Sequence, residues 1–299
     1  MSLQTKGIIL AVVSAVFYGT NPLGALILFQ EGLNVTSVVF YRFLFAVILL
    51  ALFMKFFKKS FYVTFQQLSI LAFLGTLFGI SAICLFSSFL YMDAGLASTI
   101  LFVYPIFVAI LMAIFFKEKS SIVVVLSIIL SFAGVSLLFD SNSANISFFG
   151  LSLVLISSLC YAIYIVVINR YLKISSLKTT LYSMFFCTLT ILIYSFSQEN
   201  LNIMPLNNFN MWFYSIFLAL IPTIFSLIFL VKAIELIGST SASILGALEP
   251  LTAVFIGVFV FGESLTLKIV LAIFTILLSV ILIVIKSYLE RLLRLNKRV

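Results

Sequence analysis

The chain has 299 residues, of which 64% are hydrophobic and only 9% are charged, and its mean hydropathy is +1.33. A soluble domain is about 45–50% apolar and about 25% charged, so this chain lacks the polar residues that would cover a water-soluble globule. The composition predicts an all-α integral membrane protein and excludes most classes of soluble enzyme.

The apolar residues fall into ten runs separated by short polar breaks, and each run is close to the ~20 residues that a transmembrane helix needs. Polar groups such as Lys58-Lys59 mark the breaks, and Trp212 with Tyr214 begins the eighth run as an interfacial aromatic belt would. The first run is too long for the apolar part of a cleavable signal, so we predict a retained helix. The predicted helices span residues 7–29, 35–54, 68–90, 94–116, 122–139, 149–169, 178–196, 211–231, 239–261 and 266–286.

The basic residues are distributed unevenly between the two sides of the predicted membrane. With the N-terminus in the cytoplasm, only Lys268 lies outside and Arg42 lies within a helix, while the rest of the 17 Lys and Arg residues are cytoplasmic. This bias satisfies the positive-inside rule and predicts a multi-pass protein of the cell inner (plasma) membrane with both termini in the cytoplasm. The formal charge of +8 then indicates anionic membrane lipid as a partner, and not nucleic acid. The cytoplasmic basic residues would be Lys6, Lys55, Lys58, Lys59, Lys117, Lys119, Arg170, Lys173, Lys178, Lys232, Lys286, Arg291, Arg294, Lys297 and Arg298.

The second half of the chain repeats the first half. A shift of 145 residues places one set of first-half residues on identical residues of the second half, and a shift of 143 places another set in the same way. Residues 1–143 and 144–288 are therefore predicted to form two five-helix repeats, followed by a basic cytoplasmic tail over 289–299. The first set pairs Ala97/Ala242, Ser98/Ser243, Pro105/Pro250, Phe116/Phe261 and Glu118/Glu263, and the second pairs Gly7/Gly150, Ser14/Ser157 and Tyr18/Tyr161.

An odd number of helices in each repeat has a consequence for orientation. Two five-helix repeats must enter the membrane from opposite sides, and inverted repeats of this kind are typical of secondary transporters with a substrate site near the midplane and alternating access. Two other interpretations remain open. The chain could be a duplicated scaffold without transport, or a lipid scramblase or flippase of the same fold, which would need a polar groove open to lipid.

Ten helices in two halves, together with three short segments, resemble the EamA-type family of the drug/metabolite transporter superfamily, and the resemblance covers essentially the whole chain. It implies a bacterial inner-membrane carrier for amino acids or related small metabolites, in many members an exporter. The first half departs from the family pattern, because Tyr104-Pro105 stands in place of Glu-Pro and Lys117-Glu118-Lys119 in place of Gly-Glu. The three segments are Tyr41-Arg42-Phe43, Ala247-Leu248-Glu249-Pro250-Leu251-Thr252-Ala253 and Phe261-Gly262-Glu263.

Glu249 is the sharpest candidate for a site residue. It lies near the middle of the ninth predicted helix, where a charge costs at least ~2.5–3.5 kcal/mol on insertion scales, so it should face a cavity or a partner. The adjacent Pro250 withholds an amide and loosens the helix. Glu249 is thus either a substrate or proton site beside a kink, or a structural residue bonded to neighbouring helices.

Arg42 is the only basic residue placed well inside a predicted helix and away from its ends, roughly 10 Å from the outer end at 1.5 Å per residue. Three roles are open to it. It could pair with a carboxylate of a substrate, pair with Glu249, or extend its guanidinium to the outer surface.

Two further prolines interrupt predicted helices. Asn21-Pro22 breaks the first helix and Tyr104-Pro105 breaks the fourth, and broken helices expose backbone groups that bind polar atoms of ligands. The repeat-related Tyr18 and Tyr161 are candidates to line a cavity from symmetric positions, with packing as the alternative. The candidate substrate-binding or coupling residues are therefore Glu249, Arg42, Asn21, Tyr18, Tyr104 and Tyr161, and the candidate helix breaks are Pro22, Pro105 and Pro250.

Several chemistries lack the residues that they require. The chain has no His, and Cys84, Cys160 and Cys187 lie far apart in separate apolar runs, so we expect no metal site, no cofactor and no disulfide framework. An intramembrane enzyme would need a nucleophile with a base or a metal set. A phosphate-binding loop of the Gly-x4-Gly-Lys-Ser/Thr type does not occur, so ATP is not expected as a partner. A small-molecule substrate is the expected partner.

Overall fold

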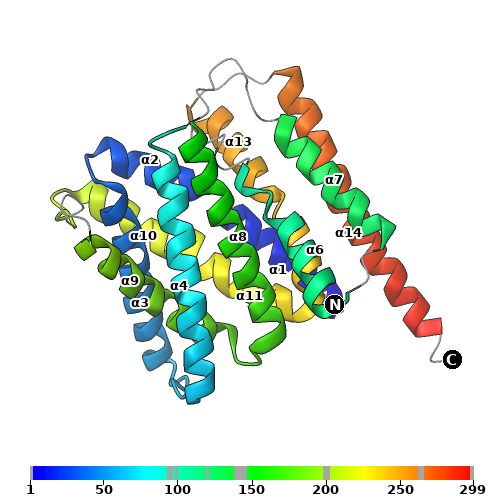
Figure 1. The fold of residues 1–299 in the computed structure, drawn as a ribbon, viewed down its shortest axis with the longest axis horizontal. Helices are drawn as coiled ribbons and strands as arrows, with labels where there is room; N and C mark the ends of the chain where they lie inside the picture. The colour runs from blue at the N-terminus through cyan, green and yellow to red at the C-terminus, as the bar shows by residue number, and fades with distance from the viewer. Residues whose placement is uncertain are drawn as a thin grey trace.

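The computed structural model describes residues 3–92, 97, 100–118, 121–137, 147–197, 203–261 and 266–296, and these residues form helices joined by short connections (Figure 1). The repeat boundary at 143–144, the matched residues Ser98 and Glu263, the residues Lys119 and Gly262, and the last three residues of the tail lie outside this range. The all-helical fold follows from the apolar environment, because a backbone in lipid must satisfy its hydrogen bonds within each segment.

The helices group into ten units, one for each predicted run, and the last of them continues to Asn296, past the predicted end at residue 286. The first half contains α1 (Leu3–Tyr18) with α2 (Asn21–Gln30), then α3 (Val35–Phe56), α4 (Phe65–Ser88), α6 (Tyr104–Phe116) and α7 (Ile122–Leu137). The second half contains α8 (Phe148–Tyr171), α9 (Ser176–Ser197), α10 (Phe209–Ala219) with the π-helical η1 (Leu220–Phe225) and α11 (Ser226–Ile237), α12 (Ser239–Leu245) with α13 (Leu248–Phe261), and α14 (Leu267–Asn296).

Six of these units are long and apolar enough to cross a bilayer. They are Leu3–Gln30, Val35–Phe56, Phe65–Ser88, Phe148–Tyr171, Ser176–Ser197 and Phe209–Ile237. The stretches Tyr104–Phe116, Ile122–Leu137 and Val270–Ile283 are shorter apolar helices. The prediction of an all-helical membrane protein with ten helices is therefore confirmed.

Polar side chains at the start of four long helices explain where those helices begin. Asn34, Ser147 and Asn208 each accept a hydrogen bond from the backbone amide three residues later. Thr64 does the same and forms a reciprocal capping box with Gln67. Such caps satisfy backbone donors that have no partner within the helix.

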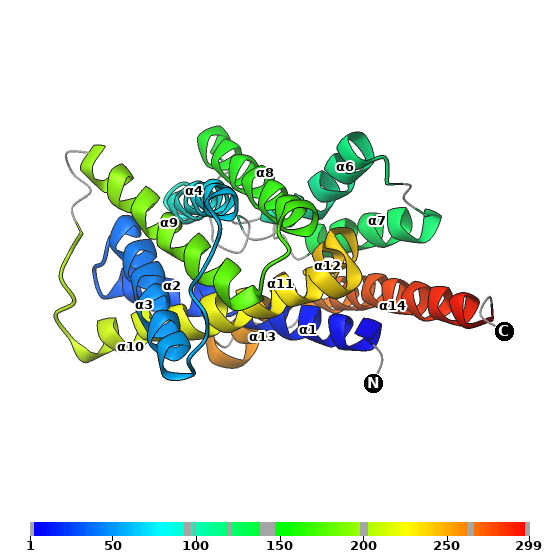
Figure 2. The same cartoon turned by 90° about the horizontal axis from the view of Figure 1, so that it is seen from below.

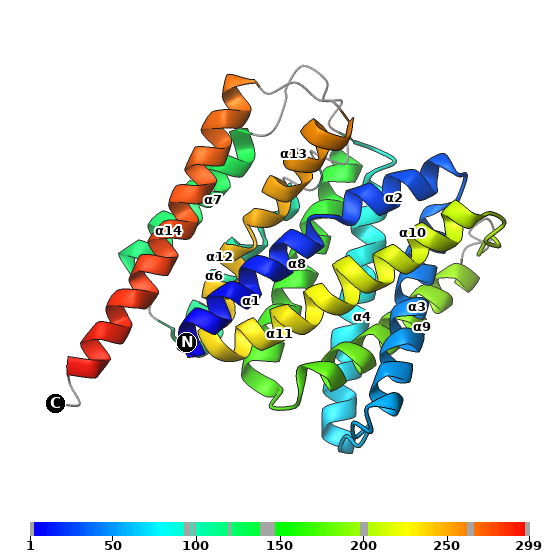
Figure 3. The ribbon, with the colours of Figure 1, turned by 180° about the vertical axis from the view of Figure 1, so that it is seen from behind.

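The helix contacts follow the pseudo-twofold relation between the halves. α1 packs against α11 just as α4 packs against α8, and α10 packs against α3 just as α4 packs against α9. The contacts between α7 and α14 and between α3 and α9 each join an element to its own repeat equivalent. Figures 1 and 2 place the α7–α14 pair at one end of the bundle and α3, α9 and α10 at the other, and Figure 3 shows α1 and α11 side by side.

Two reciprocal serine pairs hold equivalent helix crossings. Ser14 of α1 donates to the Ser226 carbonyl of α11 at 2.8 Å, and Ser226 donates back to the Ser14 carbonyl at 3.0 Å. Ser81 of α4 and Ser157 of α8 exchange the same two bonds at 3.0 and 2.8 Å. Because Ser14 matches Ser157 and Ser81 matches Ser226, the two pairs are repeat equivalents. Small hydroxyl side chains let membrane helices approach closely and bond across the gap.

Candidate functional site

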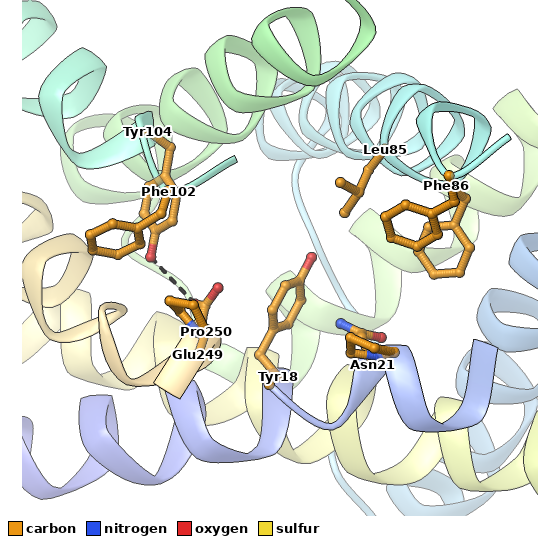
Figure 4. A pocket seen from close by; sticks show the side chains of 11 residues that line it. Tyr18, Asn21, Leu85, Phe86, Phe102, Tyr104, Glu249 and Pro250 are labelled. Carbon is orange, nitrogen blue, oxygen red and sulfur yellow. Dashed lines mark hydrogen bonds between the residues drawn. The ribbon is translucent and has the colours of Figure 1, made fainter. Parts of the chain in front are cut away.

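A cavity of about 470 Å³ lies where the break between α1 and α2 faces the end of α4, the start of α6 and the start of α13 (Figure 4). This volume counts all the empty space of the cavity, including the part that is open to solvent. It lies in the half of the bundle where α4 ends and α2 begins, which is the side away from the N-terminus (Figure 3). The lining residues are Tyr18, Gly19, Asn21, Pro22, Leu85, Phe86, Phe89, Phe102, Tyr104, Glu249 and Pro250.

Three prolines lie at the starts of the helical segments that border the cavity. Pro22 and Pro105 occupy the first turn of α2 and α6, and Pro250 is the third residue of α13. Proline is tolerated there because the first amides of a helix have no intrahelical acceptor. Each interrupted helix therefore presents a helix start close to the middle of the bundle.

Glu249 projects into the cavity beside Tyr104. The Tyr104 hydroxyl donates to Oε1 of Glu249 at 3.3 Å (Figure 4), and no hydrogen bond of the described residues reaches Oε2. Glycine makes this geometry possible on both sides. A side chain at Gly246 would collide with the Tyr104 hydroxyl, and one at Gly19 would collide with the Glu249 carbonyl. The carboxylate is thus held from one side and leaves one oxygen for another donor.

Asn21 is the second polar group of the cavity. It is only 7% exposed, and neither its amide nitrogen nor its carbonyl oxygen has a hydrogen-bond partner in the described part of the chain. A buried amide without partners is costly, which indicates that another molecule supplies them. Asn21 also begins α2, so the positive end of that helix dipole faces the same space.

The two repeat-related tyrosines are placed differently. Tyr18 lines the cavity, and its hydroxyl points into it (Figure 4). Tyr161 is 2% exposed and lies behind Tyr18, with ring centroids 5.9 Å apart and an interplanar angle of 9°. The Tyr161 ring also meets Tyr104 edge to face at 4.8 Å. The structure therefore brings Tyr18 to the cavity and keeps Tyr161 in the packed wall.

Arg42 is buried at 1% exposure and is not among the residues that line the cavity. Its Nε donates to the Thr223 hydroxyl at 2.7 Å, and its guanidinium carbon lies 4.9 Å from the ring centroid of Phe43. Neither ion pair found among the described residues joins Arg42 to Glu249. This buried position differs from the surface-directed position that the sequence left open.

The partner of Arg42 lies in a π-helical turn that the sequence analysis did not anticipate. The Thr223 hydroxyl of the turn η1 donates to the carbonyl of Leu218, five residues earlier in α10, at 2.7 Å. Pro222 in the eighth apolar run was the available signal, because a proline removes an amide from a helix and π-turns occur at such interruptions. The apolar wall of Leu85, Phe86, Phe89 and Phe102 was also missed, since nothing distinguishes four side chains among 34 Phe and many Leu residues.

Known proteins are similar to this chain over most of its length. The sequence model of the EamA-like transporter family matches residues 5–140 and 148–285. A curated protein of Archaeoglobus fulgidus, named as an uncharacterized transporter, is 28% identical over 210 residues, which is 70% of this chain and 75% of that protein.

A solved crystal structure has the same overall fold. It superimposes with a TM-score of 0.78 at 13% sequence identity, over 96% of this chain and 99% of the other.

Proposed function

Since the chain belongs to the EamA-like transporter family, we propose that it is a secondary carrier that moves a small metabolite across the membrane by alternating access. The cavity carries this proposal. It lies between inverted repeats, at three helix starts, and it holds a carboxylate with a free oxygen and an amide without partners. Carriers built from inverted repeats bind substrate at such broken helices near the midplane.

The lining favours a zwitterion with an apolar side chain, such as an amino acid or a related compound. The free oxygen of Glu249 suits an ammonium group as a charge-assisted acceptor. The start of α2 and the Asn21 amide suit a carboxylate, because a helix N-terminus attracts anions. Phe86, Phe89 and Phe102 supply an apolar wall for the rest of the molecule.

The direction of opening follows from the proposed topology. The positive-inside bias supports a cytoplasmic N-terminus in a cell inner membrane. The cavity lies on the side away from that terminus, so this conformation corresponds to an outward-facing state. A carrier in this state receives an imported substrate or has released an exported one, and export is the direction that the family resemblance favours.

Transport by the purified protein in proteoliposomes tests the proposal. Labelled phenylalanine, leucine, threonine, glutamate and lysine would be followed in uptake and efflux, with and without a pH gradient. We expect saturable transport of a neutral apolar amino acid and little transport of glutamate, because the described residues that line the cavity beside Glu249 include no basic side chain. Empty liposomes and protein with Glu249→Gln serve as controls.

A scramblase assay in the same vesicles separates the main alternative. Rapid movement of fluorescent lipid between the leaflets, without transport of any solute in the panel, would replace the carrier proposal with a lipid-moving function. An inert protein in both assays would favour the scaffold.

A further inference from the structure

The repeat relation assigns an equivalent in the other half of the bundle to every residue of the open cavity. The shift of 143 carries Tyr18 and Asn21 to Tyr161 and Tyr164 of α8. The shift of 145 carries Leu85 and Phe86 of α4, Phe89 just after it and Phe102 before α6 to the second half, where their equivalents are Leu230, Val231, Ile234 and Ala247. These six second-half residues belong to one buried cluster, and none is more than 6% exposed. The two halves differ in exposure at two pairs of positions: Tyr18 and Phe89 are partly exposed, whereas their equivalents Tyr161 and Ile234 are 2% exposed. At these positions one half of the bundle is open and its equivalent is closed.

Tyr104 and Glu249 are each other's equivalents under the shift of 145. They are joined by the 3.3 Å hydrogen bond, and α6 and α12 are in contact beside them. The pair therefore lies on the pseudo-twofold axis. A group bound to Glu249 borders the open cavity and the closed half at the same time.

The closed half contains polar atoms that its packing does not satisfy. The hydroxyls of Tyr164 on α8 and Ser183 on α9 are buried near each other, but neither makes a hydrogen bond of normal geometry with a described residue. The buried Thr180 hydroxyl on α9 has none either. Tyr164 is the equivalent of Asn21, the unsatisfied amide of the open cavity. Buried polar atoms without partners need an explanation, and a ligand or water that reaches them in another conformation provides one.

We propose that these residues form a second, latent half-site, which receives the same substrate when the cavity closes and the opposite half opens. The proposal rests on the carrier function. The ammonium group of the substrate stays at the Tyr104–Glu249 pair. The carboxylate of the substrate, or a water bound to that carboxylate, moves from Asn21 to the Tyr164 hydroxyl. The apolar wall changes from Phe86, Phe89 and Phe102 to smaller side chains at the equivalent positions.

The smaller side chains make the two half-sites unequal. Val231, Ile234 and Ala247 stand where the open cavity has Phe86, Phe89 and Phe102. The latent half-site therefore has fewer aromatic contacts and more room when it opens, and it should hold a large apolar side chain more weakly. A substrate with an aromatic or branched side chain is expected to have a lower KM on the side of the open cavity.

Paired cysteines test whether the latent half-site opens. Leu85→Cys and Leu230→Cys are repeat equivalents with the same native residue, and each would be made after replacing Cys84, Cys160 and Cys187 with Ser or Ala. A membrane-impermeant methanethiosulfonate carrying a trimethylammonium group would be added to right-side-out or inverted vesicles. We expect Leu85→Cys to react only from the face opposite the N-terminus and Leu230→Cys only from the N-terminal face. In the double variant, prior labelling at position 85 should block labelling at position 230.

Absence of labelling at position 230 in a protein that still transports would overturn the latent half-site and leave the carrier function intact. Simultaneous labelling of both positions would overturn it as well. Failure of the proteoliposome assay would instead remove the carrier function itself. Gel filtration verifies folding, and Val231→Cys replaces Leu230→Cys if that variant aggregates.

A kinetic comparison checks the role of the unsatisfied groups. Tyr164→Phe should raise the KM roughly fivefold for transport that starts from the N-terminal face, because it removes about one hydrogen bond to the substrate. The KM for transport from the opposite face should not change. Asn21→Leu should do the reverse. Labelled leucine is the probe. Equal effects of Tyr164→Phe on both faces would indicate a structural role and contradict the half-site.

Discussion

At the scale of single residues, the two charged side chains Glu249 and Arg42 have different surroundings and different roles. Glu249 lies in the cavity with one free oxygen, while Arg42 is enclosed by Tyr18, Phe43, Phe86 and the turn η1. Both charges are inside the bundle, yet only Glu249 can reach a solute in this conformation. The two positions therefore respond differently to substitution.

Replacing Glu249 with Gln should weaken substrate binding at every pH and leave the protein folded. Gln keeps the shape and an acceptor for Tyr104 but removes the negative charge, and a hydrogen bond to a charged group contributes about 1.5–3 kcal/mol. The KM for the transported amino acid should therefore rise by one to two orders of magnitude. Glu235→Gln is the matched control, because Glu235 is an exposed partner of Lys232. An unchanged KM in well-folded Glu249→Gln protein would leave Glu249 with a packing role alone.

Replacing Thr223 with Val should destabilise the protein strongly without touching the cavity. It removes the acceptor of Arg42 Nε and the bond to the Leu218 carbonyl, and leaves a buried charge with fewer partners. A hydrogen bond to a charged group contributes about 1.5–3 kcal/mol. Thermal unfolding in detergent would measure the effect. Thr76→Val, which removes only a local bond on an exposed surface of α4, should be nearly silent. Equal effects of both variants would contradict the role given to Thr223.

At the scale of helices, hydrogen-bonded serine pairs join helices from different repeats. The reciprocal serine pairs fasten α1 to α11 and α4 to α8 at equivalent crossings. A third pair joins Ser131 of α7 to Ser279 of α14, and Ser279 or Ser131 can be the donor. The pairs lie in apolar interfaces, where a bond across two helices has little competition from water.

Ser14→Ala and Ser157→Ala should destabilise the protein by similar amounts, because the two serines are repeat equivalents with the same bonds. Hydrogen bonds between membrane helices are worth about 0.6 kcal/mol on average and up to about 1.7. Unfolding in a graded series of denaturing detergent would measure the difference from wild type. Ser69→Ala is the control, since Ser69 is exposed and bonds only its own helix. A clear inequality between the first two variants would show that the crossings are not energetically equivalent.

The far end of α2 is attached to the start of α10 by a carboxylate. Glu31 accepts hydrogen bonds from the amide nitrogens of Asn208 at 2.6 Å and Asn210 at 2.8 Å. Asn208 also caps α10. The two amide donors favour the charged carboxylate and lower the pKa of Glu31 from its ordinary value.

This attachment should weaken in acid. A lowered pKa means that the bonds stabilise the folded state above the ordinary Glu pKa of about 4.3, and that this contribution is lost as the pH falls through the lower native value. Limited proteolysis of the segment before α10, compared between pH 6 and pH 3, would detect the loosening. Glu31→Gln should remove most of the pH dependence. A wild-type pattern that does not change with pH would contradict this account.

At the scale of the whole molecule, the inverted repeat determines which sides of the membrane the loops occupy. The Lys58 loop and Arg170, which pairs with Glu118, lie at the same end of the bundle as the N-terminus, and Glu31 lies at the other. The cavity opens in the half that contains Glu31. Orientation thus connects the charge bias of the sequence to the direction of transport.

Single cysteines at Lys58 and Arg170 should react with an impermeant maleimide only in inverted vesicles, and a cysteine at Met204 only in right-side-out vesicles. The reason is the concentration of basic residues on the cytoplasmic side. The experiment would use the background without native cysteines. Reaction of the Lys58 position from outside would reverse the orientation, and with it the outward-facing assignment of the cavity.

Much of the architecture is determined by local properties of the sequence. The apolar runs determine the ten helices because lipid leaves the backbone no other partners. The prolines at 22, 105 and 250 mark helix starts because proline lacks an amide. Polar starts such as Thr64 and Asn208 mark caps. Each of these signals acts within a few residues, so it can be read without knowing the packing.

Only the tertiary structure decided which residues meet. Glu249 pairs with Tyr104, and Arg42 with Thr223, although Arg42 and Glu249 are opposite charges that the sequence allowed to pair. Tyr18 and Tyr161 are equivalent in sequence, yet one lines the cavity and the other is buried. Sequence equivalence in an inverted repeat does not require that the two halves have the same environment in one conformation. The packing of this conformation exposes one of two equivalent residues to the cavity and buries the other.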